Sequence, residues 1–280
     1  MKIGIIGNGF VGKATKILQC KDIEMLCYDI NPELCEPKHL KLNDMVDCEI
    51  IFISVPTPMN KDGSVYLNII QSVLNDLKNV NFENFIVIRS TVPPGTSDSF
   101  NCYFMPEFLT EKNYRNDFIN NPLWIYGLLG KDSDEFFKNK IRKLINYAYE
   151  NKCIKSNNIK FMSNKEAELV KYFRNTFLSV KVSYCNEIYE YCNKIGINYE
   201  NVRNIAASDK RIGLSHTMVP GHDGKLGFGG TCFPKDTNGL LFEMKRNGMK
   251  SYILENAIKR NEEVDRNEKD WTKNKGRSVV

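Results

Sequence analysis

Cys232 differs from the other eight of the chain's nine cysteines in the residues around it. It lies in residues 227–236, "GFGGTCFPKD", between a glycine-rich segment and a Lys–Asp pair that begins a predicted helix. The thiolate is the reactive form of cysteine, and a helix N-terminus favours it. A thiolate can attack an electrophilic carbon and hold it covalently. We therefore predict that Cys232 is a nucleophile, the alternative being a small buried side chain without chemistry.

Two further pairs of side chains could complete such a reaction. Lys171 and Asn175 are four residues apart in a predicted helix, so their polar groups project from one face. This pair could stabilise an oxyanion, although an ordinary solvated helix face would give the same pattern. Glu107 and Glu111 follow a predicted strand, and either carboxylate could direct a water molecule.

The N-terminus carries the pattern of a dinucleotide-binding site. An apolar run typical of a buried parallel strand leads into G-x-G-x-x-G, and a helix is predicted from there through Leu18. Such a loop lets the backbone approach a pyrophosphate at the start of the helix. Asp29 ends the next predicted strand, where a carboxylate can hydrogen-bond the adenosine ribose. The predicted cofactor-binding residues here are Gly7, Asn8, Gly9, Phe10, Val11, Gly12 and Asp29.

Asp29 also favours NAD over NADP. A carboxylate about 4 Å from a 2′-phosphate costs about 4 kcal/mol per charge pair at an effective dielectric constant near 20. No arginine follows Asp29 to compensate. A nicotinamide cofactor near Cys232 would extend the cysteine chemistry to oxidation: the thiolate adds to an aldehyde, hydride passes to NAD, and water hydrolyses the resulting thioester.

Alternating strands and helices predict an α/β fold, with a Rossmann-type doubly wound sheet in residues 1–160. Further strands are expected at 49–55, 85–90, 101–106 and 123–130, with helices at about 67–78 and 132–150. The loops after two of these strands, "SVPTP" and "STVPPGT", fall at the ligand crevice of such a sheet. Val55, Thr57 and Thr91 are therefore candidate cofactor contacts, with proline-stiffened turns as the alternative.

The second half, residues 161–280, is predicted to be a helical substrate domain. Ser163 and Glu166 form a capping box before a long apolar periodicity that ends at Gly196. Six glycines lie between residues 213 and 231, which indicates a loop that bends closely around something. We therefore predict an active-site loop at 211–236, followed by helices at about 235–248 and 251–270.

Composition excludes several other classes of protein. The net charge is +5, but the basic residues are scattered, which argues against nucleic-acid binding. The cysteines are odd in number and lack CxxC spacing, so neither a disulfide framework nor a metal site is expected. No signal peptide and no apolar run of membrane-spanning length is present. We expect a cytoplasmic protein without membrane contact.

Segments along nearly the whole chain resemble the UDP-glucose/GDP-mannose dehydrogenase family: "GIIGNGFVG", "SVPTP", "STVPPGT", "PEFLTE", "AELVKYFRNTF", "RIG" and "GFGGTCFPKD". The resemblance implies an all-helical domain like that of 6-phosphogluconate dehydrogenase and a role for that domain in dimerisation. It also implies NAD-dependent, four-electron oxidation of a nucleotide sugar such as UDP-glucose, at C6, to the uronic acid. The catalytic residues that it implies are Cys232 as nucleophile, Lys171 and Asn175 at the oxyanion, Glu107 in thioester hydrolysis and Asp236 in handling water or a proton.

The same resemblance implies further contacts. Glu111 and Lys235 join Thr57 and Thr91 at the nicotinamide end of the cofactor. Arg211 reaches the partner's substrate across the interface of a homodimer. The remaining substrate-binding residues that it implies are Phe108, Leu109, Gly227, Phe228 and Gly229.

The sequence departs from the family pattern in three places. The stretch between Asp29 and Val55 is short, and the family's third, nucleotide-holding domain does not follow, so the chain resembles a short form. The loop at 214–226 is longer than expected, which makes His216, His222 and Lys225 candidates for holding the nucleotide. The alternative for the two histidines is that they are simply exposed. Two alternatives remain: a two-electron β-hydroxyacid or 6-phosphogluconate-type dehydrogenase, and a non-catalytic NAD-binding remnant.

Overall fold

The computed structural model describes residues 1–280 and contains two compact units. The first comprises Met1–Thr57 and Leu67–Lys171, and the second comprises Pro58–Tyr66 and Tyr172–Val280. The division therefore falls inside the long helix α6 (Asn164–Ile195), eleven residues beyond the 160/161 boundary expected from the sequence. The short segment Pro58–Tyr66 belongs with the C-terminal residues because Met59 N donates to Ser278 O at 2.9 Å and Val280 N donates to Met59 O at 3.0 Å.

A seven-stranded sheet forms the first unit, in the order β2-β1-β3-β4-β5-β6-β7. All neighbouring strands are parallel except β5 and β6, which are antiparallel. Strand β1 pairs with both β2 and β3, so the crevice for a ligand is expected at the carboxyl ends of these strands. The strands are β1 (Lys2–Ile6), β2 (Glu24–Tyr28), β3 (Ile50–Ile53), β4 (Phe85–Ile88), β5 (Tyr103–Phe104), β6 (Trp124–Leu128) and β7 (Ile159–Ser163).

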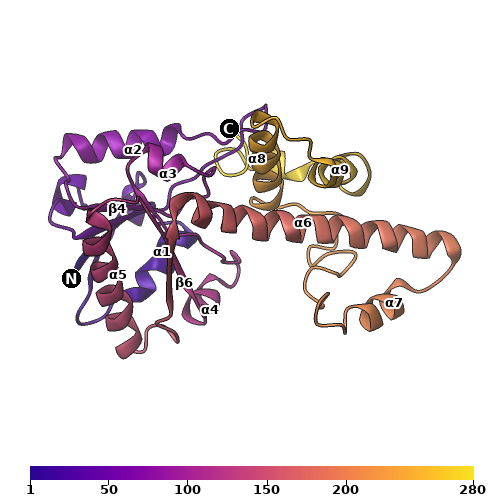
Figure 1. The fold of residues 1–280 in the computed structure, drawn as a ribbon, viewed down its shortest axis with the longest axis horizontal. Coiled ribbons are helices and arrows are strands. Elements are labelled where there is room, and N and C mark those ends of the chain that lie inside the picture. The colour runs from indigo at the N-terminus through magenta and orange to yellow at the C-terminus, as the bar shows by residue number, and fades with distance from the viewer. The chain divides into compact units, whose positions relative to one another are not determined.

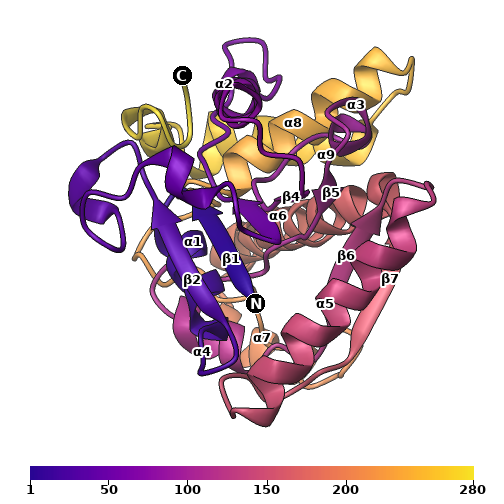
Figure 2. The same cartoon turned by 90° about the vertical axis from the view of Figure 1, so that its left-hand side faces the viewer.

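Helices cover both faces of this sheet, as the doubly wound prediction requires (Figures 1 and 2). One apolar cluster joins α1, α4 and α5 to one face, and others join α2 and the start of α6 to the opposite face. The helices of this unit are α1 (Phe10–Thr15), α2 (Asn68–Asn79), α3 (Thr96–Ser99), α4 (Tyr114–Ile119) and α5 (Ser133–Glu150), with single 3₁₀ turns at Lys16–Leu18, Pro32–Leu34 and Leu42–Met45. The predicted α/β architecture is confirmed, and β7 is a strand that the sequence did not predict.

Phe137 lies at the centre of the larger apolar cluster and is fully buried. Its ring stacks on Tyr103, with centroids 3.6 Å apart, and meets Phe85 and Tyr126 edge-on. The preceding residue, Phe136, is 71% exposed. The contrast follows from the helical period, which turns one residue of α5 to the sheet and its neighbour to solvent.

Helix α6 begins at the capping box predicted from the sequence. Ser163 N donates to Glu166 Oε2 at 2.9 Å, and Glu166 N donates to Ser163 Oγ at 3.4 Å. One turn further, the buried Glu168 accepts from Gly95 N at 2.5 Å and from Ser97 N at 2.8 Å. Glu168 thereby holds the "STVPPGT" loop against α6.

Helices make up most of the second unit. The remainder of α6 ends before Gly196, whose φ of +73° is the left-handed value expected of a C′ glycine. A small core of Tyr172, Leu240, Leu241, Leu254 and Ile258 packs α6 against the two C-terminal helices. The further elements are α7 (Tyr199–Ala206), α8 (Phe233–Arg246), α9 (Tyr252–Arg260), a π-turn (Asn261–Asp265) and a 3₁₀ turn (Asp270–Lys273).

The structure corrects one expectation for this unit and adds one helix. The helix predicted for 251–270 ends at Arg260, because the chain widens into the π-turn and then leaves the helical path at Arg266. Helix α7 was not predicted; it lies between Gly196 and the start of the predicted loop at 211, a stretch for which the sequence predicted no element. None of the helices combines the length and the apolar character needed to cross a bilayer.

Replacing Phe137 by alanine should lower the free energy of unfolding by about 3–5 kcal/mol, because it empties a closely packed aromatic site. Phe136→Ala is the matched control and should change it by no more than about 0.5 kcal/mol. Urea denaturation of the two variants measures the difference. Equal losses would contradict the placement of Phe137 in the core.

Glu168 should make stability depend on pH. Burial raises the pKa of its carboxyl to about 7, although the hydrogen bonds that it accepts from Gly95 and Ser97 lower that pKa in part. The folded state therefore retains a proton that the unfolded chain, with a glutamate pKa of about 4.3, has lost. This contribution to stability is complete below about pH 4.3 and disappears as the pH rises through about 7.

Urea titrations at pH 5 and pH 7.5 test this, with Glu168→Gln compared with Glu135→Gln, an exposed glutamate of the same unit. The wild type and Glu135→Gln should both lose about 2–3 kcal/mol more than Glu168→Gln over this interval. The same pH dependence in all three proteins would show that Glu168 titrates normally.

Candidate functional site

The glycine loop after β1 has the geometry that a dinucleotide site needs. Gly7 has φ of +90°, and a Cβ on it would lie 2.7 Å from the carbonyl oxygen of Ser54. A Cβ on Gly12 would collide with the carbonyl oxygen of Gly7. A Cβ on Gly9 would meet no atom within 4 Å, so its backbone faces open space. These glycines place no side chain at the start of α1, where a pyrophosphate is expected to bind, and the residues fit a dinucleotide.

Asp29 lies at the edge of this loop. Its Oδ2 accepts from Asn8 N at 2.7 Å, and its Oδ1 accepts from Asn31 N at 2.9 Å. The Asn8 side chain turns away to donate to Leu34 O at 2.7 Å. The carboxylate is therefore fixed beside the glycine loop at the end of β2, the position from which it could accept from a ribose hydroxyl. Phe10 and Val11 form the first turn of α1, half-buried.

The loops after β3 and β4 contact each other. Thr57 Oγ1 donates to Thr91 O at 2.8 Å, and Ser90 Oγ donates to Val55 O at 2.6 Å. Parallel pairing of β3 and β4 brings the two loops to the same edge of the sheet. The hydroxyl proton of Thr57 is used inside the protein, so this side chain supports the loops as turn chemistry would.

A buried ion pair joins two residues that the sequence analysis considered separately. Lys171 Nζ donates to Glu107 Oε1 at 2.7 Å, and the two side chains are only 4% and 6% exposed. Glu107 Oε2 accepts from Leu109 N at 2.8 Å, which folds the "PEFL" segment around the carboxylate. The Lys171 ammonium lies 6.0 Å from the ring centroid of Phe108. Glu111, four residues beyond Glu107, is exposed.

The second unit contains another buried polar group. Asn175 Nδ2 donates to Asp236 Oδ2 at 2.5 Å, and Lys235 Nζ pairs with Asp236 Oδ1 at 2.6 Å. All three residues are buried. Cys232 is the N-cap of α8, where its carbonyl accepts from Asp236 N at 2.8 Å, and its side chain is half-buried. The structure thus brings Cys232, Lys235, Asp236 and Asn175 together at the start of one helix.

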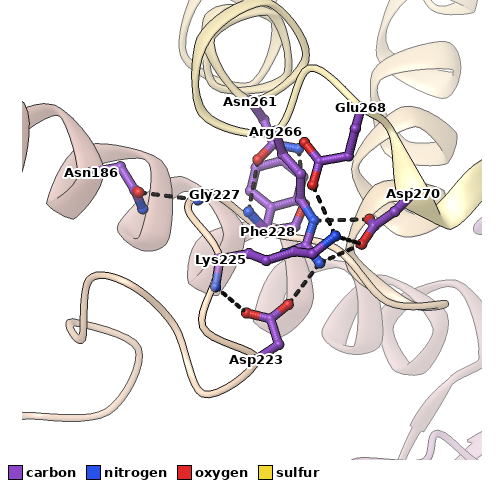
Figure 3. Close-up of polar contacts among 9 residues, drawn as sticks. All are labelled: Asn186, Asp223, Lys225, Gly227, Phe228, Asn261, Arg266, Glu268 and Asp270. Atoms are coloured by element: carbon purple, nitrogen blue, oxygen red, sulfur yellow. Dashed lines mark hydrogen bonds and ion pairs between the residues drawn. The ribbon is translucent and has the colours of Figure 1, made fainter.

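Side chains from two helical segments hold the glycine-rich approach to Cys232. Gly227 N donates to Asn186 Oδ1 at 3.0 Å (Figure 3). Asn261 both accepts from Phe228 N, at 2.7 Å, and donates to Phe228 O, at 2.9 Å. Asn186 lies on the same face of α6 as Lys171 and Asn175, and this helical spacing is a signal by which the sequence could have identified it. Asn261 gave none, because its role depends on the π-turn.

Three further candidates have no hydrogen bond to these groups. Arg211 has a 90% exposed side chain and makes a two-pronged contact with the neighbouring Asp209, the closer approach being 2.6 Å. His216 Nδ1 lies 2.5 Å from Ser215 Oγ, and its ring centroid is 5.7 Å from that of Phe233. His222 is exposed on the same loop.

Both halves of the chain match models of the same protein family. The NAD binding domain of the UDP-glucose/GDP-mannose dehydrogenase family matches residues 38–146, and the central domain of the same family matches residues 165–263. The match to the NAD binding domain confirms that the cofactor is NAD, as predicted from the glycine loop and Asp29.

Individual proteins agree with the family match. A UDP-glucose 6-dehydrogenase of Rickettsia bellii is 32% identical over 94% of the chain and 67% of its own length. Another, of Pseudomonas aeruginosa, is 32% identical over 78% of the chain and 49% of its own length. The chain spans between 57% and 67% of the length of the Rickettsia relatives that it matches.

Solved structures show the same fold. A UDP-glucose dehydrogenase from Pyrobaculum islandicum superposes with a TM-score of 0.79 at 24% identity, covering 93% of this chain and 68% of that one. A 3-hydroxyisobutyrate dehydrogenase from Mycobacterium tuberculosis gives 0.67 at 13% identity, covering 92% and 91%. Together, the family matches, the Rickettsia relative and the shared fold show that the chain belongs to the UDP-glucose/GDP-mannose dehydrogenase family.

Proposed function

We propose that this protein is an NAD-dependent nucleotide-sugar 6-dehydrogenase that oxidises UDP-glucose, or a related UDP-hexose, at C6 to the uronic acid. The observation that carries the proposal is the position of Cys232. It caps a helix whose first turn contains the buried Lys235–Asp236 pair, bonded in turn to Asn175. A thiol in this setting has an activating helix N-terminus and an ordered polar group beside it.

Bound NAD supplies the hydride acceptor for two successive oxidations, alcohol to aldehyde and thiohemiacetal to thioester, each yielding one NADH and one proton. Cys232 forms a sulfur–carbon bond with the C6 aldehyde, and the carbonyl oxygen takes the proton that completes the thiohemiacetal. After the second oxidation, water attacks the thioester, the sulfur–carbon bond breaks, and Cys232 regains its thiol as the uronate leaves. Gly7, Gly9, Gly12 and Asp29 hold the dinucleotide.

The other buried groups take the roles that charge and geometry allow. Lys171 offers an ammonium to the oxyanion that develops at C6, and its partner Glu107 accepts a proton from the attacking water. Asn175, oriented by Asp236, adds an amide donor. Because burial and pairing fix these side chains, little reorganisation accompanies the reaction. Thr57, Thr91, Glu111 and Lys235 are assigned to the nicotinamide end of the cofactor.

We further propose that the enzyme is a homodimer in the cytoplasm, where reducing conditions keep its nine thiols intact. An exposed apolar row on α6 supports a second copy as the partner: Phe173, Phe177, Tyr184, Tyr191 and Ile195 are each at least half exposed. Phe173 and Phe177 already stack with their ring planes 3° apart. A row of this size is typical of an interface rather than of a monomer surface.

The substrate contacts are assigned to both copies. Arg211, exposed and on the same unit as this apolar row, reaches the partner's nucleotide sugar. Phe108, Leu109, Gly227, Phe228 and Gly229 line the sugar, and the loop carrying His216 and His222 helps to hold the nucleotide.

Cys232→Ser should abolish formation of uronate from UDP-glucose, because serine at this position lacks a stable anion at neutral pH. We expect kcat to fall by at least about 10³-fold, as it does when the nucleophile of other enzymes is removed. Cys153→Ser, at another half-buried cysteine, is the matched control and should retain activity. Normal uronate production by Cys232→Ser would refute the assigned role.

A further inference from the structure

Arg266 is a buried arginine that contacts two different segments of the second unit. It is 4% exposed, and its Nη2 donates to Asp223 Oδ2 at 2.7 Å and to Asp270 Oδ2 at 2.8 Å (Figure 3). Its Nε donates to Asp270 Oδ1 at 2.9 Å, which makes the Asp270 contact two-pronged. Asp223 lies on the glycine-rich loop, whereas Asp270 lies beyond the π-turn. The guanidinium therefore ties the loop to the C-terminal segment.

Lys225 reinforces this tie from the side of the loop. Its Nζ donates to Glu268 Oε1 at 2.9 Å and to Asp270 Oδ2 at 2.8 Å. Hydrogen bonding from Arg266 is the largest influence on Asp270 and holds the pKa of that carboxyl well below its usual range. Asp270 therefore remains charged in mildly acidic as well as neutral solution, and the network persists with it.

Two glycines of the loop lie too close to this network to carry a side chain. A Cβ on Gly229 would lie 2.6 Å from Arg266 Nε and 2.7 Å from its Nη2, so the loop backbone rests directly on the guanidinium. A Cβ on Gly227 would collide with Asn261 Oδ1, the atom that accepts from Phe228 N. These two glycines are thus required by close approach to residues 261–266.

We propose that residues 261–270 clamp the loop at 221–231, with Arg266 as the positioning residue that fixes the approach to Cys232. A loop with this many glycines loses much conformational entropy when it is ordered. The hydrogen bonds and ion pairs of Asn261, Arg266 and Lys225 offset this loss of entropy during folding, before substrate binds. Preorganisation of this kind raises the rate of reaction, whereas the affinity for NAD is proposed to depend on the glycine loop after β1.

The same contacts argue against a phosphate site at Arg266. The N–H groups described above are directed at carboxylates, and Asp223, Glu268 and Asp270 surround the cation with negative charge. An incoming phosphate would have to displace these carboxylates and would be repelled by them. Arg266 therefore acts through the loop and not by contact with the nucleotide.

Hydrogen–deuterium exchange of the loop amides tests the clamp directly. Arg266→Ala and Asp223→Asn should exchange about tenfold faster than wild type in peptides covering 221–231. Arg266→Lys should restore part of the protection against exchange, because lysine keeps the positive charge but lacks the planar guanidinium that makes the two-pronged contact. Arg246→Ala is the matched control, because it removes a paired but 62% exposed arginine from α8, and it should exchange at the wild-type rate. Asp223→Asn changes only an exposed loop residue and preserves the Arg266–Asp270 pair, so it also tests the clamp if Arg266→Ala fails to fold.

The catalytic consequence rests on the proposed function, and kinetics with UDP-glucose and NAD test it. Arg266→Ala and Asp223→Asn should lower kcat about 10- to 100-fold while leaving KM for NAD within about twofold. Unchanged exchange in both variants would overturn the clamp whatever their activity. Faster exchange with unchanged kcat would overturn the positioning role. A wild-type protein that oxidises no nucleotide sugar would instead contradict the proposed function, while the exchange data would still decide whether the clamp exists.

Discussion

The buried pair of Lys171 and Glu107 is the interaction on which the arrangement of candidate residues in the first unit depends. Both charges are almost completely removed from water, so neither is tolerated without the other. Removing one partner of such a pair costs about 3–5 kcal/mol, because the remaining charge stays buried. The pair fastens the segment after β5 to the start of α6. With Glu168 holding the loop after β4 to the same helix, the sheet's loops are set by the position of α6.

The second unit orders its loop by the same physical means. Asn175, Lys235 and Asp236 satisfy one another in a buried group at the start of α8, where Cys232 is the N-cap. Burial strengthens each of these bonds and makes an unpaired member costly, so the group has one favourable arrangement. Candidate reactive side chains in both units are therefore held by polar partners within the unit. Such support keeps catalytic groups within the narrow limits of productive geometry.

The sequence predicted those parts of the structure that depend on local patterns. The glycine loop, the capping box at Ser163 and Glu166, and the end of α6 at Gly196 each follow from residues close together in the chain. The strands β1 to β6 were recognisable as apolar runs. Strand β7 contains no fully buried residue and so lacks the continuous apolar run that marked the other strands, and α7, with eight residues, is too brief to show a clear periodicity.

Long-range pairing was beyond the reach of the sequence. Lys171 and Glu107 are separated by 64 positions, and no local pattern indicates that they form a pair. The helix predicted for 251–270 was wrong because Asn261 bonds Phe228, 33 positions away, in a π-turn that helical periodicity does not reveal. The role of Arg266 was likewise not predictable from the sequence, because it depends on contacts with Asp223 and Asp270 that only the fold creates.

The central claim is that one protein carries out both oxidations and holds the intermediate between them on Cys232. The ratio of NADH formed to uronate formed, measured with purified protein, NAD and UDP-glucose, tests this claim most directly. The account predicts two NADH for each uronate, with no aldehyde released. One NADH per product, with the sugar left as an aldehyde and with activity insensitive to thiol alkylation, would contradict it and favour a two-electron dehydrogenase.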